Sequence, residues 1–316
     1  MADKGLQLKL FDGSVLPSTD LVHYPYFDLF FHTLPLRRNI KRIVTIHDIT
    51  PLIFPEHFPT GMKGKINFFL QKAALKNTDF VICDSQSSKK DVENFFHYPK
   101  EKIKVIYLAP NPIYKKKEVK DCQKVAKKYK LPKKFILYVG DINWNKNLKG
   151  LLKAASIAKT TLVMVGSALV QEDMPEVKAI ETIISELGIQ ENIIKTGFVP
   201  ASDLVLIYNL ASATVLPSFY EGFGLPVLES MACGTPVICS NNSSLAEISG
   251  QLVQYCNPND PQDIAQKIVE NLKQGSYERN SLSEKLINHS KKFSWEKTAK
   301  QTISVYKKLV NPNQFK

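Results

Sequence analysis

Residues 217–240, with the sequence PSFYEGFGLPVLESMACGTPVICS, constrain the fold of this chain more than any other segment. A short apolar run at 213–216 ends at a Pro-Ser pair and is typical of a buried strand. Pro226 suits the first turn of a helix, where its missing N–H has no intrahelical partner. Gly234 ends that helix, and residues 236–240 have the composition of another strand. The segment therefore predicts a strand, a glycine loop, a helix and a second strand, the repeating unit of parallel α/β sheets.

The glycine loop of this unit has the features of an anion-binding site. Its backbone N–H groups lie at the start of the helix, where the helix dipole favours a negative charge. The glycines let the backbone approach a ligand without a Cβ atom in the way. The N–H groups expected to face the anion are those of Gly222, Phe223, Gly224 and Leu225.

Two carboxylates, Glu221 and Glu229, flank this loop. Glu229 lies about one turn inside the helix, and its side chain leans back toward the N-terminus. A carboxylate beside a phosphate is repulsive unless it accepts hydrogen bonds from hydroxyl groups next to that phosphate. The arrangement therefore suits a sugar–diphosphate–ribose chain, that is, a nucleotide sugar. An ordinary helix start with two solvated glutamates is the alternative.

The whole segment, with both glutamates at this spacing, resembles the signature of the family 4 retaining glycosyltransferases. The resemblance implies an α/β protein of GT-B architecture, in which two Rossmann-like domains with parallel sheets face a cleft. It implies a hexosyltransferase that moves a hexose such as mannose from a GDP- or UDP-hexose to a hydroxyl of a glycan or lipid-linked acceptor, with retention and without a metal or other cofactor. Synthesis of a cell-envelope polysaccharide is the expected setting. Glu221 would hold the donor sugar, and Glu229 the ribose.

Two other functions stay open. The chain could be a donor-binding subunit, or an inactive homologue that needs a partner. It could also be a nucleotide-sugar epimerase of the same architecture, which would need no acceptor.

A second segment, 138–148, resembles the first turn of the donor domain in the same family. Gly140 would leave room for a ligand beyond the carboxyl end of a strand, where ligands bind in such sheets. Lys146 matches the basic residue that neutralises the donor diphosphate. Asp141 and Asn145 stand where many relatives carry arginine, so Lys146 would have to supply more of the leaving-group stabilisation.

Shorter motifs supply the remaining candidates. Residues 197–199 resemble the base-contacting loop, with backbone groups near Val199 facing the nucleobase. His47 and Asp48 follow an apolar strand and resemble the His-Asp motif of the family, which implies that His47 contacts the transferred sugar or stabilises charge at the anomeric carbon. His23, Tyr24 and Asp48 are candidates for the acceptor side. Residues 83–91 also match a family segment and supply helix-cap hydroxyls, so we interpret them as mainly structural.

Strand-like and helical segments alternate along the chain, as in α/β proteins. Strands are expected at 21–24, 42–46, 80–83, 104–108, 135–139, 161–165, 193–196, 213–216, 236–238 and 252–255. Helices are expected at 63–76, 87–96, 148–158, 176–187, 203–209, 226–233 and 261–271.

The domains expected from this pattern are an N-terminal domain (1–130), a donor-binding domain (131–293) and a C-terminal helix (294–316). Ser294 caps that helix, which either completes the second domain or packs back on the first. Relatives have further strand–helix units before the segment that matches residues 20–24. The first domain is therefore expected to lack two or three strands, which puts acceptor binding in question.

The composition fits a soluble cytoplasmic protein. The chain has 316 residues, of which 44% are hydrophobic, with no apolar run long enough to span a bilayer and no signal peptide at its start. Its five cysteines are scattered, which argues against a disulfide framework or a zinc site.

The net charge of +12 comes in large part from ten lysines within residues 115–134. This stretch is rich in lysine rather than arginine and has few aromatic residues, which disfavours nucleic acid as a partner. We expect either attraction to an anionic membrane, with the protein peripheral at its inner face, or simple solvation.

Overall fold

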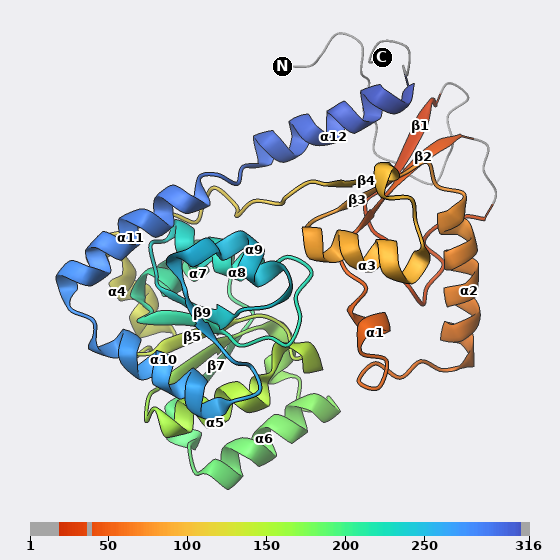
Figure 1. The fold of residues 1–316 in the computed structure, drawn as a ribbon. Helices are drawn as coiled ribbons and strands as arrows, with labels where there is room; N and C mark the ends of the chain where they lie inside the picture. The colour runs from red at the N-terminus through yellow and green to blue at the C-terminus, as the bar shows by residue number, and fades with distance from the viewer. Residues whose placement is uncertain (1–18, 37–39, 311–316) are drawn as a thin grey trace.

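The computed structural model describes residues 19–36 and 40–310, which form two α/β domains (Figure 1). Each domain contains one sheet, and all strand pairings in both sheets are parallel. The α/β class and the paired domains predicted from the sequence are confirmed. No helix within the described residues is long and apolar enough to cross a membrane.

The first domain has a four-stranded sheet in the order β1-β2-β3-β4 and is the smaller of the two, as predicted. The strands are β1 (Leu21–Tyr24), β2 (Lys41–Ile46), β3 (Phe80–Cys83) and β4 (Ile103–Val105). The helical segments are α1 (Thr50–Ile53), α2 (Met62–Lys76), α3 (Gln86–Phe96) and the 3-10 turn η1 (Lys100–Lys102).

The alternation of side chains along β3 explains how this sheet is covered on both faces. Val81 and Cys83 belong to the core that α2 and α3 complete. Phe80 and Ile82 point the other way and share a core with Val305 of α12 (Trp295–Val310). A strand buried on both faces has to be apolar throughout, which is the pattern of β3.

The C-terminal helix thus packs on the first domain and not on the second. Ser294 caps it, because its side-chain oxygen accepts a hydrogen bond from the N–H of Lys297 at 3.3 Å. Figure 1 shows α12 crossing from the second domain to the outer face of the first sheet.

The second domain has a six-stranded sheet in the order β10-β9-β8-β5-β6-β7. Its strands are β5 (Ile136–Val139), β6 (Leu162–Val165), β7 (Ile193–Gly197), β8 (Ala213–Leu216), β9 (Val237–Ser240) and β10 (Gln254–Cys256). The chain builds β6 and β7 on one side of β5, and then returns to place β8 on the other side. The reversal between β5 and β8 is a topological switch point, the usual ligand site of an open parallel sheet.

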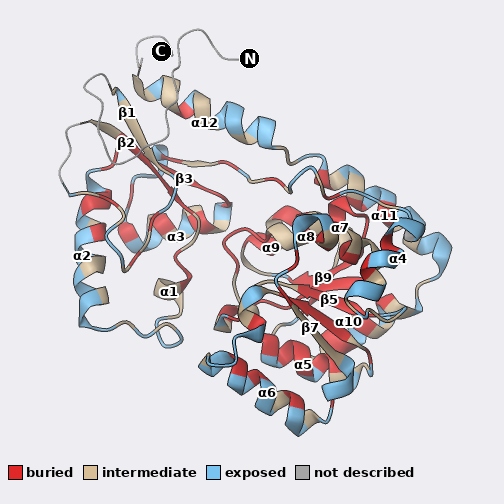
Figure 2. Ribbon diagram, turned by 180° about the vertical axis from the view of Figure 1, so that it is seen from behind, coloured by how far each residue is buried: buried red, intermediate tan, exposed pale blue. Residues whose placement is uncertain are grey.

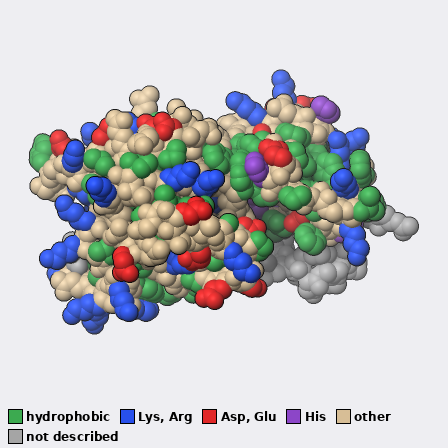
Figure 3. Space-filling model, turned by 90° about the horizontal axis from the view of Figure 1, so that it is seen from below, with side chains coloured by type: hydrophobic (Ala, Val, Ile, Leu, Met, Phe, Trp, Pro, Cys, Tyr) green, Lys and Arg blue, Asp and Glu red, His purple; other side chains and the backbone are tan. Residues whose placement is uncertain are grey.

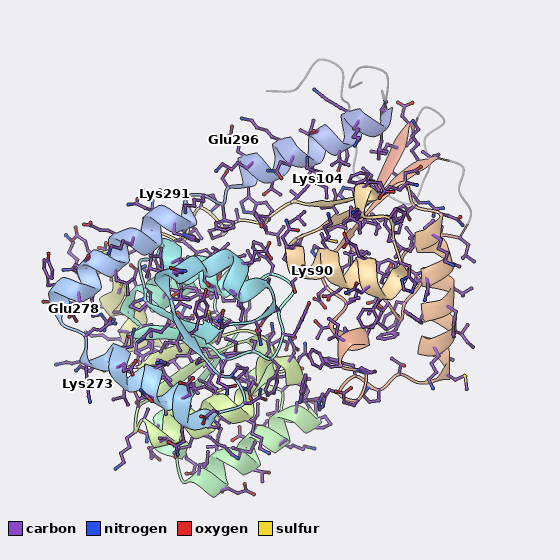
Figure 4. All side chains as sticks on the ribbon, viewed as in Figure 1. Lys90, Lys104, Lys273, Glu278, Lys291 and Glu296 are labelled. Carbon is purple, nitrogen blue, oxygen red and sulfur yellow. The ribbon has the colours of Figure 1, made fainter. Side chains whose placement is uncertain are left out.

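Helices lie on both faces of this sheet, whose strands are largely buried (Figure 2). They are α4 (Val119–Lys128), α5 (Leu148–Ile157), α6 (Pro175–Leu187), α7 (Ala201–Leu210), α8 (Leu225–Ala232), α9 (Ser243–Ser249), α10 (Pro261–Lys273) and α11 (Ser276–Ser290). Lys273, Glu278 and Lys291 near the ends of α10 and α11, and Glu296 on α12, mark the solvent side of the outer helices (Figure 4).

The lysine-rich segment is part of the second domain. Its helix α4 packs against α7, and Val125 of α4 belongs to the same core as Phe135 and Tyr208. The sequence pattern puts the domain boundary at residue 130. The core of the second domain, however, already includes residues before that position.

Candidate active site

Lys146 and Glu221 meet at the switch point of the second sheet. Lys146 lies in the 3-10 turn η2 (Trp144–Lys146) that follows β5, and Glu221 follows the adjacent strand β8. The Lys146 Nζ atom lies 2.9 Å from Oε1 and 2.7 Å from Oε2 of Glu221, and Ser218 Oγ donates a further hydrogen bond of 2.7 Å to Oε1. The Glu221 side chain is 8% exposed and that of Lys146 is 21% exposed. The two residues thus form a nearly buried ion pair.

Two asparagines beside Lys146 fix the loops that carry this pair. Asn147 has a left-handed backbone, with φ of 53°, and its side-chain N–H₂ donates to the carbonyls of Pro217 (3.0 Å) and Pro258 (2.7 Å). Asn145 donates from Nδ2 to the carbonyl of Tyr220 at 2.9 Å. Asn145 therefore ties the loop after β8 to the loop after β5.

The glycine loop is in direct contact with the first domain. A Cβ atom on Gly222 would lie 2.7 Å from Asp48 Cβ and 2.7 Å from the His47 carbonyl oxygen. Only glycine allows this approach, so the end of β2 and the loop before α8 form one continuous surface. His47, Asp48, Glu221 and Gly222, predicted separately from the sequence, lie together.

Four successive backbone N–H groups of the loop are unpaired within the described residues. The N–H of Glu221 bonds to Ser243 Oγ at 3.1 Å, but no acceptor is found there for the four that follow, from Gly222 to Leu225. Gly224 has φ of +100° at the N-cap of α8 and turns the chain into the helix. The Phe223 side chain is buried, with its ring 6.3 Å from that of Tyr107, so it contributes only its backbone to the loop.

Glu229 occupies a different environment from Glu221. Its Oε2 accepts a hydrogen bond of 2.9 Å from the buried hydroxyl of Tyr208. Burial raises the pKa of the Glu229 carboxyl to about 7, although the hydrogen bond from Tyr208 opposes that rise. The two glutamates of the motif therefore lie in different electrostatic environments, since Glu221 is paired with a lysine and Glu229 with a tyrosine hydroxyl.

His47 is held by Asp84, a partner that the sequence did not reveal. His47 Nδ1 lies 2.5 Å from Asp84 Oδ2, and Nε2 lies 3.1 Å from the carbonyl oxygen of Pro25. The hydrogen bond to Asp84 raises the pKa of His47, against an opposing effect of burial. Because Ile46 pairs with Cys83 in the parallel register of β2 and β3, the residues that follow them come side by side.

The structural interpretation of residues 83–91 was therefore incomplete. Ser85 does cap α3, since its side chain accepts a hydrogen bond of 3.0 Å from the N–H of Ser88. Asp84, however, is buried and orients the histidine. The sequence did contain a signal for this role, because Asp84 directly follows β3 and His47 directly follows the neighbouring strand β2.

The contacts of the acceptor-side candidates are mainly structural. His23 Nδ1 lies 2.5 Å from the Tyr306 hydroxyl of α12, and Nε2 lies 2.8 Å from Thr45 Oγ1. Tyr24 packs against the core between the first sheet and α2, and Asp48 accepts a hydrogen bond of 2.9 Å from the N–H at the start of α1. The ring nitrogens of His23 thus bond to α12 and β2, so its contacts belong to the packing of α12 on the first sheet and do not support a place in the acceptor site.

Two donor-side candidates lie at other strand ends of the second sheet. Gly140 follows β5, and a Cβ atom on Gly166 would lie 2.1 Å from the Gly140 carbonyl oxygen, so these two turns pack closely. Val199 follows β7 and is buried, so only its backbone is available to a ligand. Next to it Phe198 is 75% exposed, an aromatic ring that sequence reasoning did not single out.

Further contacts join the domains around the loop. The N–H of Gln86 donates to the Glu247 carboxylate at 2.9 Å, and the Tyr107 hydroxyl donates to the same group at 2.6 Å. The His57 and Trp144 rings stack with their centroids 3.5 Å apart. Within the described residues no cluster of three or more His, Cys, Asp or Glu side chains could hold a metal ion.

Comparison with known proteins identifies the family of the chain. The family model for glycosyl transferases group 1 matches residues 119–293, and that for glycosyltransferase family 4 matches residues 12–111. The O-antigen chain mannosyltransferase B of Escherichia coli is 32% identical over 298 residues, which cover 90% of this chain and 75% of that protein.

Solved structures share the fold at lower identity. Sucrose-phosphate synthase from Thermosynechococcus elongatus superimposes with a TM-score of 0.73 at 24% identity. The superposition covers 86% of this chain and 69% of the synthase chain. Anabaena HepE, solved with UDP and glucose, superimposes with a TM-score of 0.72 at 21% identity and covers 84% and 71% of the two chains. The chain belongs to the glycosyl transferases group 1 family, and its fold is GT-B.

Proposed function

We propose that the protein transfers a hexose from a nucleoside diphosphate sugar to a hydroxyl group of a glycan or lipid-linked acceptor, with retention at the anomeric carbon and without a metal ion. The observation that carries this proposal is the Lys146–Glu221 pair beside four unpaired loop amides at the switch point of the second sheet. The relationship to an O-antigen mannosyltransferase favours mannose as the hexose. A GDP- or UDP-linked donor is compatible with the site.

The ion pair suggests how the site accepts a donor. An incoming diphosphate would share the Lys146 ammonium with Glu221 and take hydrogen bonds from the N–H groups of Gly222 to Leu225. Glu221 would then accept hydrogen bonds from the hydroxyls of the sugar. These N–H groups and the Lys146 ammonium are in place before the reaction and would stabilise the charge that develops on the leaving diphosphate. Such preorganised electrostatics usually contributes most to catalysis.

The other candidates surround this centre. His47, oriented by Asp84 and in contact with the loop through its carbonyl, would face the transferred sugar. Glu229 would accept from the ribose, and the backbone near Val199 would contact the base. The exposed ring of Phe198 offers a surface for stacking on that base. We also propose that the protein works in the cytoplasm, at the inner face of the membrane when the acceptor is lipid-linked.

The test compares Lys146→Ala and Glu221→Ala with the wild type in sugar transfer from a panel of GDP-, UDP- and ADP-hexoses. Loss of one preorganised contact should lower kcat/KM on the order of 10²–10³-fold. Lys149→Ala is the matched control, because Lys149 is exposed on the neighbouring α5 and should leave the rate unchanged. Thermal unfolding of each variant checks that it is folded.

Wild-type rates in both variants would overturn the proposal. Donor binding by the wild type without turnover, for every acceptor offered, would favour the donor-binding subunit. Retention is read from the anomeric configuration of the product by NMR, and metal independence from the rate in excess chelator.

A further inference from the structure

Helix α2 of the first domain is apolar on its outer face as well as on its inner one. Gln71, Ala74 and Leu75 are buried toward the core. On the opposite side Met62 is 73% exposed and Phe69 is 69% exposed. Large apolar side chains of a surface helix ordinarily face the core, so those on the outer side of α2 lack the covering that apolar side chains usually have.

The exposed apolar side chains form one continuous stripe. Met62, Ile66, Phe69 and Leu70 follow the spacing i, i+4, i+7, i+8, which puts them on a single side of the helix. Phe31 is 70% exposed in a segment that lies along α2, where the Asn67 side chain donates a hydrogen bond of 2.8 Å to the Phe30 carbonyl. Scattered exposed apolar residues are normal, whereas a contiguous patch marks an interaction site.

Positive charge borders this stripe. The sequence of α2 contains four lysines and no aspartate or glutamate. Two of these lysines, Lys72 and Lys76, line a cavity of about 360 Å³ together with His97 and Lys102. Figure 3 shows hydrophobic side chains and lysines together on the lobe formed by the first domain, and Figure 2 shows the exposure of α2 along its length.

We propose that this face of α2 lies on an anionic phospholipid bilayer, with the apolar stripe inserted among the lipids and the lysines at the level of the phosphate groups. A helix with bulky apolar residues on one face and lysines beside them is the pattern of interfacial membrane binding. The membrane placement deepens the proposed function, since it brings a lipid-linked acceptor to the enzyme.

The lysine-rich segment 115–134 does not offer the same combination. It carries more lysines than α2, but no large apolar side chain among its described residues belongs to the exposed set. Charge alone gives weak, salt-sensitive attachment, whereas charge together with inserted side chains gives both attraction and anchoring. The membrane surface predicted from the sequence is therefore better assigned to α2.

A second copy of the chain is a less suitable occupant. In a symmetric dimer the same patch would meet itself, so four lysines of one protomer would face four of the other without acids on α2 to offset them.

The position of α2 also suits an acceptor that arrives from the membrane. Helix α2 connects the parallel strands β2 and β3, so it runs antiparallel to them. Its first turn, at Met62, therefore lies toward the edge of the sheet where β2 ends, just before His47. The stripe begins at that edge and extends away from it.

The experiment measures binding of the full chain to phosphatidylcholine vesicles with and without phosphatidylglycerol by co-flotation. The wild type should bind the anionic vesicles and be released by salt. Ile66→Ser combined with Phe69→Ser, and separately Lys65→Gln combined with Lys76→Gln, should each weaken that binding about tenfold or more. Tyr277→Ser on α11, where Tyr277 is 85% exposed, and Lys124→Gln combined with Lys127→Gln on α4 are matched controls and should bind as the wild type does.

Equal binding by the α2 variants and the wild type would overturn the proposal, as would a wild type that binds neither vesicle. A concentration-dependent dimer in light scattering that the α2 variants abolish would assign the face to a second copy instead. Donor turnover with a soluble acceptor should be unchanged in all these variants. A wild type that binds the anionic vesicles but does not turn over the sugar donor would count against the proposed function and not against the membrane face.

Discussion

The two domains each bury a titratable side chain, and burial moves the two pKa values in opposite directions. In the second domain it raises the pKa of Glu229 to about 7 from an ordinary value of 4.5. In the first domain burial, followed by the nearby charge of His47, lowers the pKa of His23 to about 4 from 6.5. In both cases the neutral form is favoured, because an apolar environment disfavours the charged form of an acid and of a base alike.

The consequence for stability has opposite signs. The folded protein keeps a proton on Glu229 that the unfolded chain loses, so this group lowers the free energy of unfolding as pH rises from about 4.5 to 7. The unfolded chain binds a proton at His23 that the folded protein excludes, so this group lowers the same free energy as pH falls from about 6.5 to 4. Between about 4.5 and 6.5 the two effects cancel, and removing either residue should expose the other.

The largest effect is expected for Glu229→Gln. Glutamine keeps an acceptor for the Tyr208 hydroxyl but cannot ionise, so the cost of charging a buried carboxylate disappears. At pH 8 the variant should be more stable than the wild type by about 3 kcal/mol, and at pH 4.5 the two should be nearly equal. Chemical denaturation at the two pH values measures the difference. A stability change of the same size at both would show that Glu229 is not protonated in the folded protein near neutral pH.

A smaller and opposite effect is expected for His23→Gln. At pH 7 the loss of the hydrogen bond to Tyr306 should cost about 1 kcal/mol. At pH 4 the variant should be more stable than the wild type by about 2 kcal/mol, because it escapes the about 3 kcal/mol that the buried histidine loses on acidification. Tyr306→Phe removes the same hydrogen bond without the titration and serves as the control. Parallel pH profiles for the wild type and His23→Gln would contradict the shifted pKa.

The sequence predicted strand bounds closely in both domains, with 21–24 and 80–83 equal to β1 and β3, and for a physical reason it also predicted the site motif of the second domain. Its central motif combines a buried strand, a glycine loop and a capped helix in one continuous segment, where local rules suffice. The strand at 213–216 was predicted with the bounds that the structure has. Helices α4, α9 and α11 of this domain were not predicted, since α9 is only seven residues long and α4 and α11 are mostly polar on surfaces that need little apolar content.

The pairings within the site were less accessible, because they join residues far apart in the chain. Lys146 and Glu221 are 75 residues apart and meet only because β5 and β8 are neighbours. Asp84 reaches His47 through the register of β2 and β3. The apolar content of residues 63–76 predicted a helix, but it could not tell which of its apolar faces would be left exposed.

The smallest effect that we expect concerns the pair of His47 and Asp84. It tests whether the first domain positions a catalytic group at all. In the wild type the Asp84 carboxylate holds His47 Nδ1 and raises the pKa of the imidazole. Asp84→Asn removes that carboxylate. Loss of a hydrogen bond to a charged group costs on the order of 1.5 kcal/mol, which corresponds to about a tenfold fall in kcat/KM. The histidine limb of the pH–rate profile should also move to lower pH, because the group that favours the imidazolium is gone. Asp121→Asn, at an exposed acid of α4, should change neither quantity. A tenfold fall with the pH limb in its original place would give Asp84 a structural role only, because positioning of a titrating histidine requires the rate and the profile to change together.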